Sequence, residues 1–194
     1  MDKFIELKFS IPTLKGISSK NIEEHLKLYS GYVKNANLVS KKIVELSKDY
    51  ENNSYLIGEL NRRFSFEFNG MMNHKYYFEQ FTGLIDNKDE KSSLFVQITR
   101  QWGSIDEWIK EFKNLALTRG IGWAMLYFDP ISSCLINSWV DEQHLGQLNG
   151  CKTILALDMW EHSYVSDYMP SGKKQYIEDF FSNIDWKIIE GRFN

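Results

Sequence analysis

Residues 153–162 read TILALDMWEH, an apolar run followed at once by an acid and, four residues further on, by a histidine. The run 153–157 is short, apolar and partly β-branched, which is typical of a buried strand. Asp158 then stands at the end of this strand, where side chains leave the core, and His162 follows on a turn or in the first turn of a helix. A carboxylate beside a neutral imidazole suits Fe, Mn or Zn better than Ca or Mg, which prefer oxygen ligands. The stretch therefore predicts a strand that ends at a metal site.

Two further histidines lie inside amphipathic helical patterns. An Asp–His pair at this spacing is, by itself, more often a surface ion pair, and a single buried histidine is usually a satisfied core residue. His25, however, belongs to the apolar face of its helix and is expected to point inward. His74 stands among aromatic residues, with Gly70 one turn earlier on the same face. Together the chain offers three imidazoles and one carboxylate for a metal ion: His25, His74, Asp158 and His162.

Five stretches resemble the iron/manganese superoxide dismutase family, and together they span essentially the whole chain. The most specific is 158–164, DMWEHSY, which is similar to the family signature D-x-W-E-H-A-Y. The other four contain His25 with Tyr32, Asn73 with His74, Trp102 with Gly103, and Gly120 with Trp123. They occur in the order in which the family has them, so coincidence is improbable.

The resemblance implies a metal site and a reaction. It implies that His25, His74, Asp158 and His162 bind one Fe or Mn ion per subunit, with water or hydroxide as the fifth ligand. The implied reaction is the disproportionation of superoxide to dioxygen and hydrogen peroxide by a metal that cycles between two oxidation states. Neutral imidazoles and a single carboxylate leave little net charge at the metal, so its surroundings can tune the potential. Redox-inert zinc could not support this chemistry.

Tyr32 is the candidate for the family's gateway tyrosine. It lies seven residues after His25, about two helical turns, so both residues share one helix face. The family's usual spacing at this point is eight. We expect Tyr32 to hold a hydrogen bond toward the metal-bound solvent and to pass protons to the peroxide product. The alternative is an ordinary core tyrosine.

The family also supplies a glutamine, or in some members a histidine, that bonds the metal-bound solvent. In iron-type members it often comes from the position of Gly70, which leaves an empty space here. In manganese-type members a glycine stands there and the glutamine comes from the segment before the third strand. Counting back from Asp158 selects Gln143, with His144 as its rival. The arrangement favours Mn, or a site that works with either metal, although the ligand types alone do not select between them.

A homodimer is expected from the residue between Trp160 and His162. Glu161 matches the family's glutamate, which crosses the dimer to bond the partner's last histidine ligand, here the partner's His162. The family's other dimer contact, a histidine paired with a tyrosine, is changed at both ends, to Leu28 or Tyr29 and to Val165. Because both ends change together, we expect an altered isologous interface.

Composition agrees with a compact enzyme that acts on a small anion. A chain of 194 residues that is 43% hydrophobic can bury a large core as one or two small domains. A net charge of -3 argues against nucleic acid as a partner. Superoxide is itself an anion, so Lys173 or Lys174 is expected to replace the missing arginine of the family's access funnel. Cys134 and Cys151 do not form a C-x-x-C pair, and no disulfide is implied.

Two features bear on the location of the protein. No apolar stretch reaches the length of a membrane span, and the first residues lack the apolar core of a signal peptide. We therefore expect a cytoplasmic protein without a membrane partner.

The order of the predicted elements gives an α+β fold. Two long helices, 19–47 and 55–82, are expected to form an N-terminal α-helical hairpin domain over residues 1–88, with Ser18 as the first N-cap. The polar run 86–91 has the character of a linker.

Residues 89–194 are expected to form an α/β domain with a small antiparallel sheet. A helix, a glycine and a second helix opened by a capping box at Ser104 come first. Three strands, 123–128, 135–139 and 153–157, follow. The metal would lie between the two domains, which would each contribute two ligands.

Two other functions remain open. One is a non-catalytic metal-binding or assembly module that keeps the dismutase fold. The other is a hydrolase or dioxygenase-like metalloenzyme, because three imidazoles and a carboxylate also suit Lewis-acid chemistry. We prefer the dismutase, because a scaffold has no reason to keep three buried imidazoles.

Overall fold

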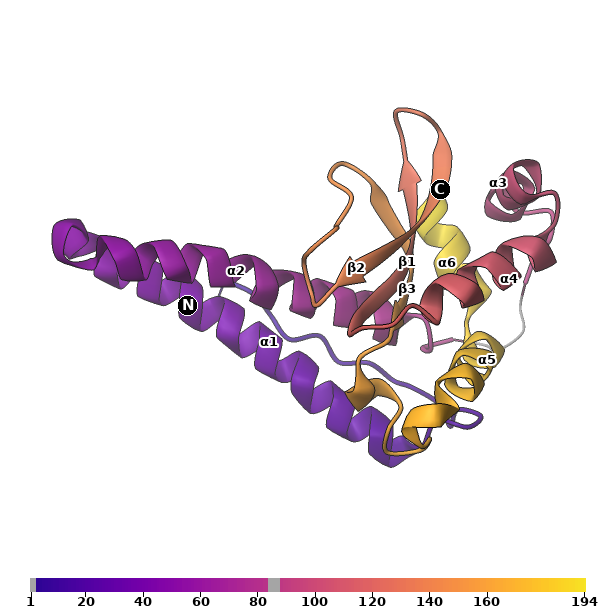
Figure 1. Ribbon diagram of the computed structural model, residues 1–194, viewed down its shortest axis with the longest axis horizontal. Helices are drawn as coiled ribbons and strands as arrows, with labels where there is room; N and C mark the ends of the chain where they lie inside the picture. The colour runs from indigo at the N-terminus through magenta and orange to yellow at the C-terminus, as the bar shows by residue number, and fades with distance from the viewer. Residues whose placement is uncertain (1–2, 84–87) are drawn as a thin grey trace.

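A long helical hairpin precedes a smaller, more compact α/β part (Figure 1). The computed structural model describes residues 3–83 and 88–194. The hairpin consists of α1 (Ser19–Leu46) and α2 (Tyr50–Glu79), joined by a single 3-10 turn, Ser47–Asp49. Its tip projects away from the sheet, whereas the other end of the hairpin packs against the rest of the chain (Figure 1).

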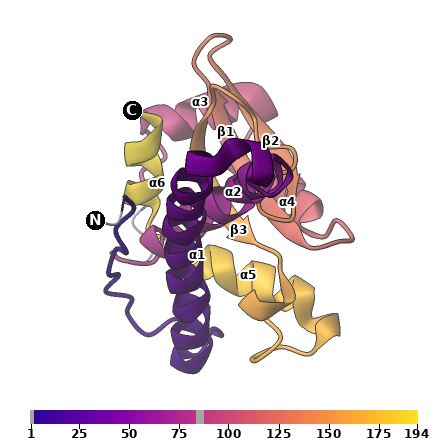
Figure 2. The same ribbon diagram turned by 90° about the vertical axis from the view of Figure 1, so that its left-hand side faces the viewer.

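The second part contains two helices, a three-stranded sheet and two further helices. These are α3 (Ser93–Trp102), α4 (Ile105–Ala116), β1 (Gly122–Asp129), β2 (Cys134–Asp141), β3 (Lys152–Asp158), α5 (Lys173–Asn183) and α6 (Trp186–Phe193). The strand order is β2-β1-β3 and both pairings are antiparallel. Most of the sheet lies above the C-terminal half of α2 in Figure 1, and α5 lies below this helix in two perpendicular views (Figures 1 and 2). The α+β fold expected from the sequence is therefore confirmed.

The helix starts follow local capping chemistry. Ser18 caps α1, since its Oγ accepts a hydrogen bond of 3.1 Å from the backbone N–H of Asn21. Ser104 caps α4 in the same way, through the N–H of Glu107 at 3.1 Å. Gly103 precedes it with φ +82°, a left-handed conformation that ends α3 and turns the chain.

The second long helix begins earlier than the sequence pattern predicted, at Tyr50 instead of residue 55. The intervening asparagines resemble a turn, but their side chains bond back to Asp49. Asn52 Nδ2 donates to its carboxylate at 3.0 Å and Asn53 Nδ2 to its main-chain carbonyl at 2.8 Å. The asparagine side chains therefore bond within the first turn and do not interrupt the helix.

The three predicted strands are confirmed, each one or two residues longer than expected at its ends. The boundary at residue 88 between two domains stays a prediction. Asp86 and Asn87, which open the predicted linker, lie outside the described residues. Among the described residues, none of the helices combines the length and apolar character that a membrane crossing requires.

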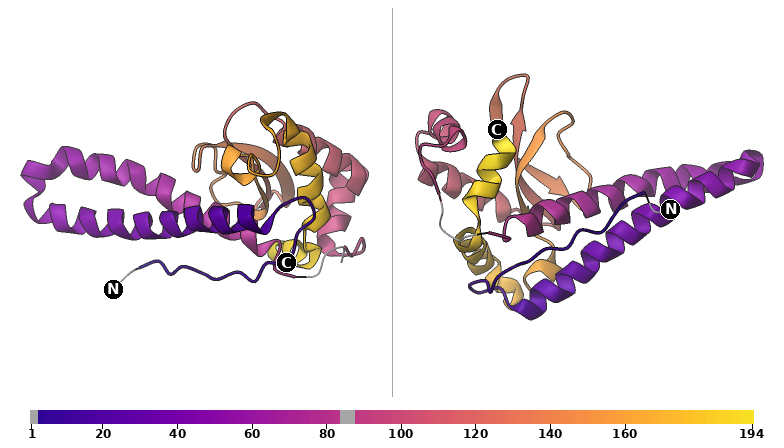
Figure 3. Two further views of the ribbon diagram at one scale, coloured as in Figure 1. Left: turned by 90° about the horizontal axis from the view of Figure 1, so that it is seen from below. Right: turned by 180° about the vertical axis from the view of Figure 1, so that it is seen from behind.

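The N-terminal segment runs along the hairpin before α1 begins (Figure 3). Asn37 of α1 holds it through both of its amide atoms. Its Oδ1 accepts from the N–H of Phe4 at 2.9 Å, and its Nδ2 donates to the carbonyl of Phe4 at 2.8 Å. Further along, the ring of Phe9 packs against Tyr29 and Phe78. The segment therefore covers the outer side of the junction between α1 and α2.

A buried glutamine joins α2 to the edge of the sheet. Gln80, which follows α2 directly, is 0% exposed. Its Nε2 donates to the carbonyl of Ala156 at 2.8 Å, and its Oε1 accepts from the N–H of Ala156 at 2.8 Å. The side-chain amide thus takes the place of a neighbouring strand at the edge strand β3. Arg192 of α6 adds bonds to the carbonyls of Ile154 at 3.0 Å and Tyr76 at 2.8 Å.

Replacing Gln80 should weaken the fold strongly. In Gln80→Leu the side chain keeps a similar volume, but the buried N–H and C=O of Ala156 lose their partners. Each unsatisfied group costs about 1–3 kcal/mol, so we expect the free energy of unfolding to fall by about 2–5 kcal/mol in chemical denaturation. The half-buried Gln97 is the control, because among the described residues its amide nitrogen bonds Gln101 and the carbonyl of Ser133, and neither bond reaches the sheet edge at Ala156. Equal losses in Gln80→Leu and Gln97→Leu would contradict the role of Gln80.

Candidate metal centre

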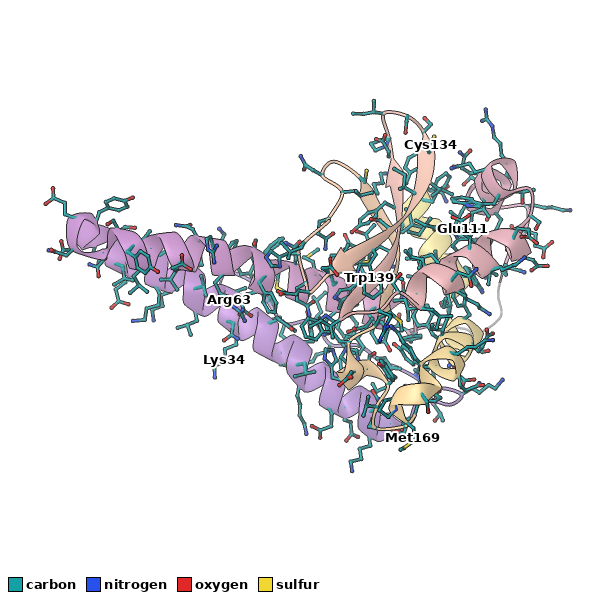
Figure 4. All side chains as sticks on the ribbon, in the orientation of Figure 1. Lys34, Arg63, Glu111, Cys134, Trp139 and Met169 are labelled. Carbon is teal, nitrogen blue, oxygen red and sulfur yellow. The ribbon has the colours of Figure 1, made fainter. Side chains whose placement is uncertain are left out.

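The four side chains that the sequence singled out converge where the hairpin meets the end of β3. Side chains fill the region between the hairpin and the sheet (Figure 4). His25 comes from α1, His74 from α2, Asp158 from the end of β3, and His162 from the 3-10 helix Glu161–Ser163. One ligand atom from each lies within 4.8 Å of the others. The side chain of His162 is 24% exposed and the other three are fully buried.

All three imidazoles turn their Nε2 atoms toward one carboxylate oxygen. The distances to Asp158 Oδ2 are 3.1 Å from His25, 3.2 Å from His162 and 3.7 Å from His74. Nδ1 of His74 donates to the carbonyl of Gly70 at 2.6 Å, so its Nε2 carries a lone pair. That buried Nε2 has no hydrogen-bond partner among the described residues. A lone pair aimed at a carboxylate and two other imidazoles fits a metal ion held between them.

The electrostatics keep the donor atoms available for a metal. Burial lowers the pKa of His74 to about 3, and burial also lowers the pKa of His25, so both rings stay neutral. Burial alone would raise the pKa of Asp158, but the neighbouring His162 and His25 outweigh it and hold the pKa below its ordinary value. The centre therefore combines one ionised carboxylate with neutral imidazoles, which suits a transition metal.

Three hydrogen bonds fix the orientation of Asp158. Its Oδ1 accepts from the N–H of Trp160 at 2.8 Å, which leaves Oδ2 for the three imidazoles. Its main-chain carbonyl accepts from the hydroxyls of Tyr176 and Ser163, each at 3.0 Å. These partners hold the carboxylate at the end of β3 in a single direction.

Aromatic rings enclose the imidazoles. The ring centroid of His25 lies 4.9 Å from those of both Tyr77 and Phe78, and that of His74 lies 5.1 Å from Trp123. Trp160 stacks beside the more exposed His162. This shell limits water in the centre and keeps the local dielectric low.

Tyr32 and Gln143 lie beside the centre in one hydrogen-bonded chain. The ring of Tyr32 is 4.9 Å from that of His74, and its hydroxyl accepts from Gln143 Nε2 at 3.0 Å. Gln143 is 0% exposed, and its Oε1 accepts from Trp123 Nε1 at 2.9 Å. Burial, followed by the charge of Asp158, raises the pKa of the Tyr32 phenol. The structure thus brings Gln143 to Tyr32, whereas His144 packs on Phe66.

The prediction of an empty space beside Gly70 is wrong, because the ring of Tyr32 occupies that space. A Cβ atom at Gly70 would lie 2.5 Å from Cδ1 of that ring. With Tyr32 seven residues after His25, the tyrosine ring rests directly on the backbone of α2. Position 70 must therefore lack a side chain for the ring to stay where it is.

The remaining candidates lie at the surface. Glu161 is exposed beside His162 on the 3-10 helix. Lys174 is exposed, and Lys173 donates through Nζ to the carbonyl of Thr118 at 2.8 Å. Which lysine stands in for the family's arginine stays a prediction.

Sequence patterns did not reveal the residues that hold Gln143. Trp123 and Asn73 belong to recognised stretches, but their bonds to Gln143 span 20 and 70 residues. Gln147 and Asn73 bond the main chain of Gln143, and no periodicity marks them. The one available signal was the position of Gln147 four residues after Gln143, within one loop between two strands.

Comparison with known proteins relates the chain to a single family. The C-terminal domain of iron/manganese superoxide dismutases matches residues 90–192. A protein named superoxide dismutase [Fe] from Cupriavidus metallidurans is 34% identical over 183 residues, which cover 93% of this chain and 90% of that one. Its namesake from Aquifex pyrophilus is 31% identical over 186 residues, 93% and 85% of the two chains.

A relative named for the other metal also matches. The superoxide dismutase [Mn] from Haloarcula marismortui is 41% identical over 98 residues, 50% of this chain and 47% of its own length. With a matching C-terminal domain and relatives that align over most of both chains, this protein belongs to the iron/manganese superoxide dismutase family.

Proposed function

We propose that this protein is a superoxide dismutase that converts superoxide into dioxygen and hydrogen peroxide. The observation that carries the proposal is the convergence of three imidazoles and one carboxylate within 4.8 Å, in a chain of this family. Relatives that align over most of its length are named superoxide dismutase. The non-catalytic alternative is not favoured, because the ligand set is intact.

The proposed cofactor is one Fe or Mn ion per subunit, held by His25, His74, Asp158 and His162. When bound, the ion would supply the electron transfer, accepting an electron from one superoxide and returning it to another. Gly70 and Gln143 support a preference for Mn, or the use of either metal, since the resemblance associates this arrangement with manganese-type members. Relatives named for Fe and relatives named for Mn both match the chain.

Tyr32 is the proposed proton donor to the reduced product. Peroxide needs two protons, while the raised pKa of the Tyr32 phenol keeps a proton on Oη at neutral pH. Because Gln143 Nε2 donates to that same oxygen, the phenol proton is left to point elsewhere. Trp123 fixes Oε1 of Gln143 and so keeps its amide nitrogen toward Tyr32. The three side chains together would orient one proton toward the centre.

We also propose a homodimer in which Glu161 bonds the partner's His162. Glu161 is exposed beside a ligand that is itself 24% exposed, so both ends of such a bond are accessible in one subunit. Leu28 and Val165, at the altered contact, are each 41% exposed and apolar, which supports an interface there. The cytoplasmic location stays a prediction.

Loss of one imidazole should remove the metal. For His74→Ala we expect loss of bound Fe or Mn and a fall in superoxide consumption of more than about a hundredfold, because a buried ligand disappears and no described neighbour replaces it. Elemental analysis and pulse radiolysis of protein expressed with each metal measure the two effects. His144→Ala removes an imidazole of the same kind outside the centre and should keep metal and activity. Activity that persists in His74→Ala would refute the ligand assignment.

Gln143 and His144 can be separated by the same measurements. Gln143→Ala removes the donor to Tyr32, and we expect about a ten- to hundredfold loss of activity and a shifted metal preference or reduction potential. His144→Ala should leave both unchanged, since its ring packs on Phe66. The reverse result, an effect from His144 and none from Gln143, would exchange their roles.

The dimer proposal rests on one exposed carboxylate. Glu161→Ala should weaken self-association at least about tenfold, because the partner's imidazole loses a charged hydrogen-bond partner at the interface. Sedimentation velocity over a range of concentrations gives the dissociation constant. Glu24→Ala is the control, as Glu24 is an exposed acid of α1 paired with Lys27. A wild-type protein that stays monomeric at all concentrations, or a mutant that dimerises normally, would rule out the proposed bridge.

A further inference from the structure

The loop between β2 and β3 turns Gln143 into the protein. Asp141 N–H donates to the carbonyl of Leu145 at 2.8 Å, and Leu145 N–H donates back at 3.2 Å, which closes a tight turn. Glu142 within it adopts a positive φ of 51°. Both the side chain and the main-chain carbonyl of Gln143 consequently find their partners inside the protein.

Two side-chain amides hold that main-chain carbonyl. Asn73 Nδ2 donates to the oxygen of Gln143 at 3.0 Å, and Gln147 Nε2 donates to it at 3.3 Å. Gln147 Nε2 also donates to Asn73 Oδ1 at 3.0 Å. Because Asn73 directly precedes His74, these bonds tie the loop of Gln143 to the helix that carries a metal ligand.

The hydroxyl of Tyr127 sets the orientation of the Gln147 amide. It donates to Gln147 Oε1 at 2.5 Å, while Nε2 faces the two oxygens of Asn73 and Gln143. A flipped amide would place its oxygen against those two oxygens, without a hydrogen between them. Burial raises the pKa of Tyr127, so its hydroxyl keeps the proton that it donates.

We propose that Gln147 is a positioning residue for Gln143. It connects β1, through Tyr127, to α2, through Asn73, and to the loop of Gln143. The side chain of Gln143 makes two bonds, 3.0 Å to Tyr32 and 2.9 Å to Trp123. Both bonds require the main chain of Gln143 to stay in place, since a shift of about 1 Å would lengthen them beyond hydrogen-bond distance. The catalytic consequence rests on the proposed dismutase function, whereas the positioning itself does not.

Gln147→Glu is the sharpest test. The side chain keeps its size and its acceptor for Tyr127, but a carboxylate oxygen replaces the donor that faces Asn73 and Gln143. In the metal-free, ¹⁵N-labelled full chain, the indole Nε1–H signal of Trp123 reports the position of Gln143 Oε1, and we expect it to shift. In the Fe-loaded protein we expect a shifted midpoint potential and a fall in kcat of about tenfold, with KM nearly unchanged.

Gln101→Glu is the matched control. Gln101 also bonds the main chain of a strand, donating to the carbonyl of Leu135 at 2.9 Å and accepting from its N–H at 2.7 Å. The same substitution there should lower thermal stability without moving the Trp123 signal or the potential.

The outcomes separate positioning from a purely structural role. A Gln147→Glu protein that is less stable, but has an unmoved Trp123 signal and potential, overturns the proposal. Should this variant fail to fold, Tyr127→Phe removes the hydroxyl that orients the amide, and an unmoved Trp123 signal in that variant overturns it equally. A wild-type protein without dismutase activity would instead overturn the proposed function, and the indole signal would still decide whether Gln147 positions Gln143.

Discussion

The pairing of the Gln80 side chain with the backbone of Ala156 fixes the geometry on which the centre depends. The helix before Gln80 carries His74, and the strand that continues from Ala156 ends at Asp158. One bidentate amide therefore sets the approach of two candidate ligands that are far apart in sequence. It also closes part of a sheet edge, so the same contact serves folding and the site. Arg192 brings the C-terminal helix to this junction as well.

In the described part of the chain, the candidate centre leaves a buried nitrogen lone pair without a partner, which a cation could supply. Asp158 is fully buried and ionised, and the lone pair on Nε2 of His74 faces it at 3.7 Å. The neighbouring His162 and His25 offset the cost of burying this carboxylate, whereas the buried Nε2 of His74 is left without a hydrogen-bond partner among the described residues. A bound ion would turn these opposing dipoles into ligands, and its binding free energy would then also stabilise the junction of hairpin and sheet. Metal binding and the stability of the junction between hairpin and sheet would thus depend on the same four side chains.

Much of this architecture follows from patterns that repeat along the chain. Helical periodicity predicted that His25 and His74 point inward, and the apolar run before Asp158 predicted a strand end at the centre. The start of α2 was predicted too late because its asparagines resemble a turn, whereas in the structure they bond back to Asp49 within the helix. The contacts of Gln80 and Gln147 could not be predicted from the sequence for a different reason. A single side-chain amide that bonds a distant main chain produces no periodic or compositional pattern. Sequence counting left Gln143 and His144 close rivals, and only the path of the loop shows which one reaches Tyr32.

The contact between Tyr32 and Gly70 also constrains how this protein can change. Any side chain at position 70 would collide with the phenol ring, so an amide cannot be supplied from α2 while the tyrosine remains in place. A lineage that moved the amide from the loop to the helix would have to relocate the ring in the same step. Two simultaneous replacements are rarer than one, so the spacing of the first helix restricts which positions near the candidate centre can carry an amide.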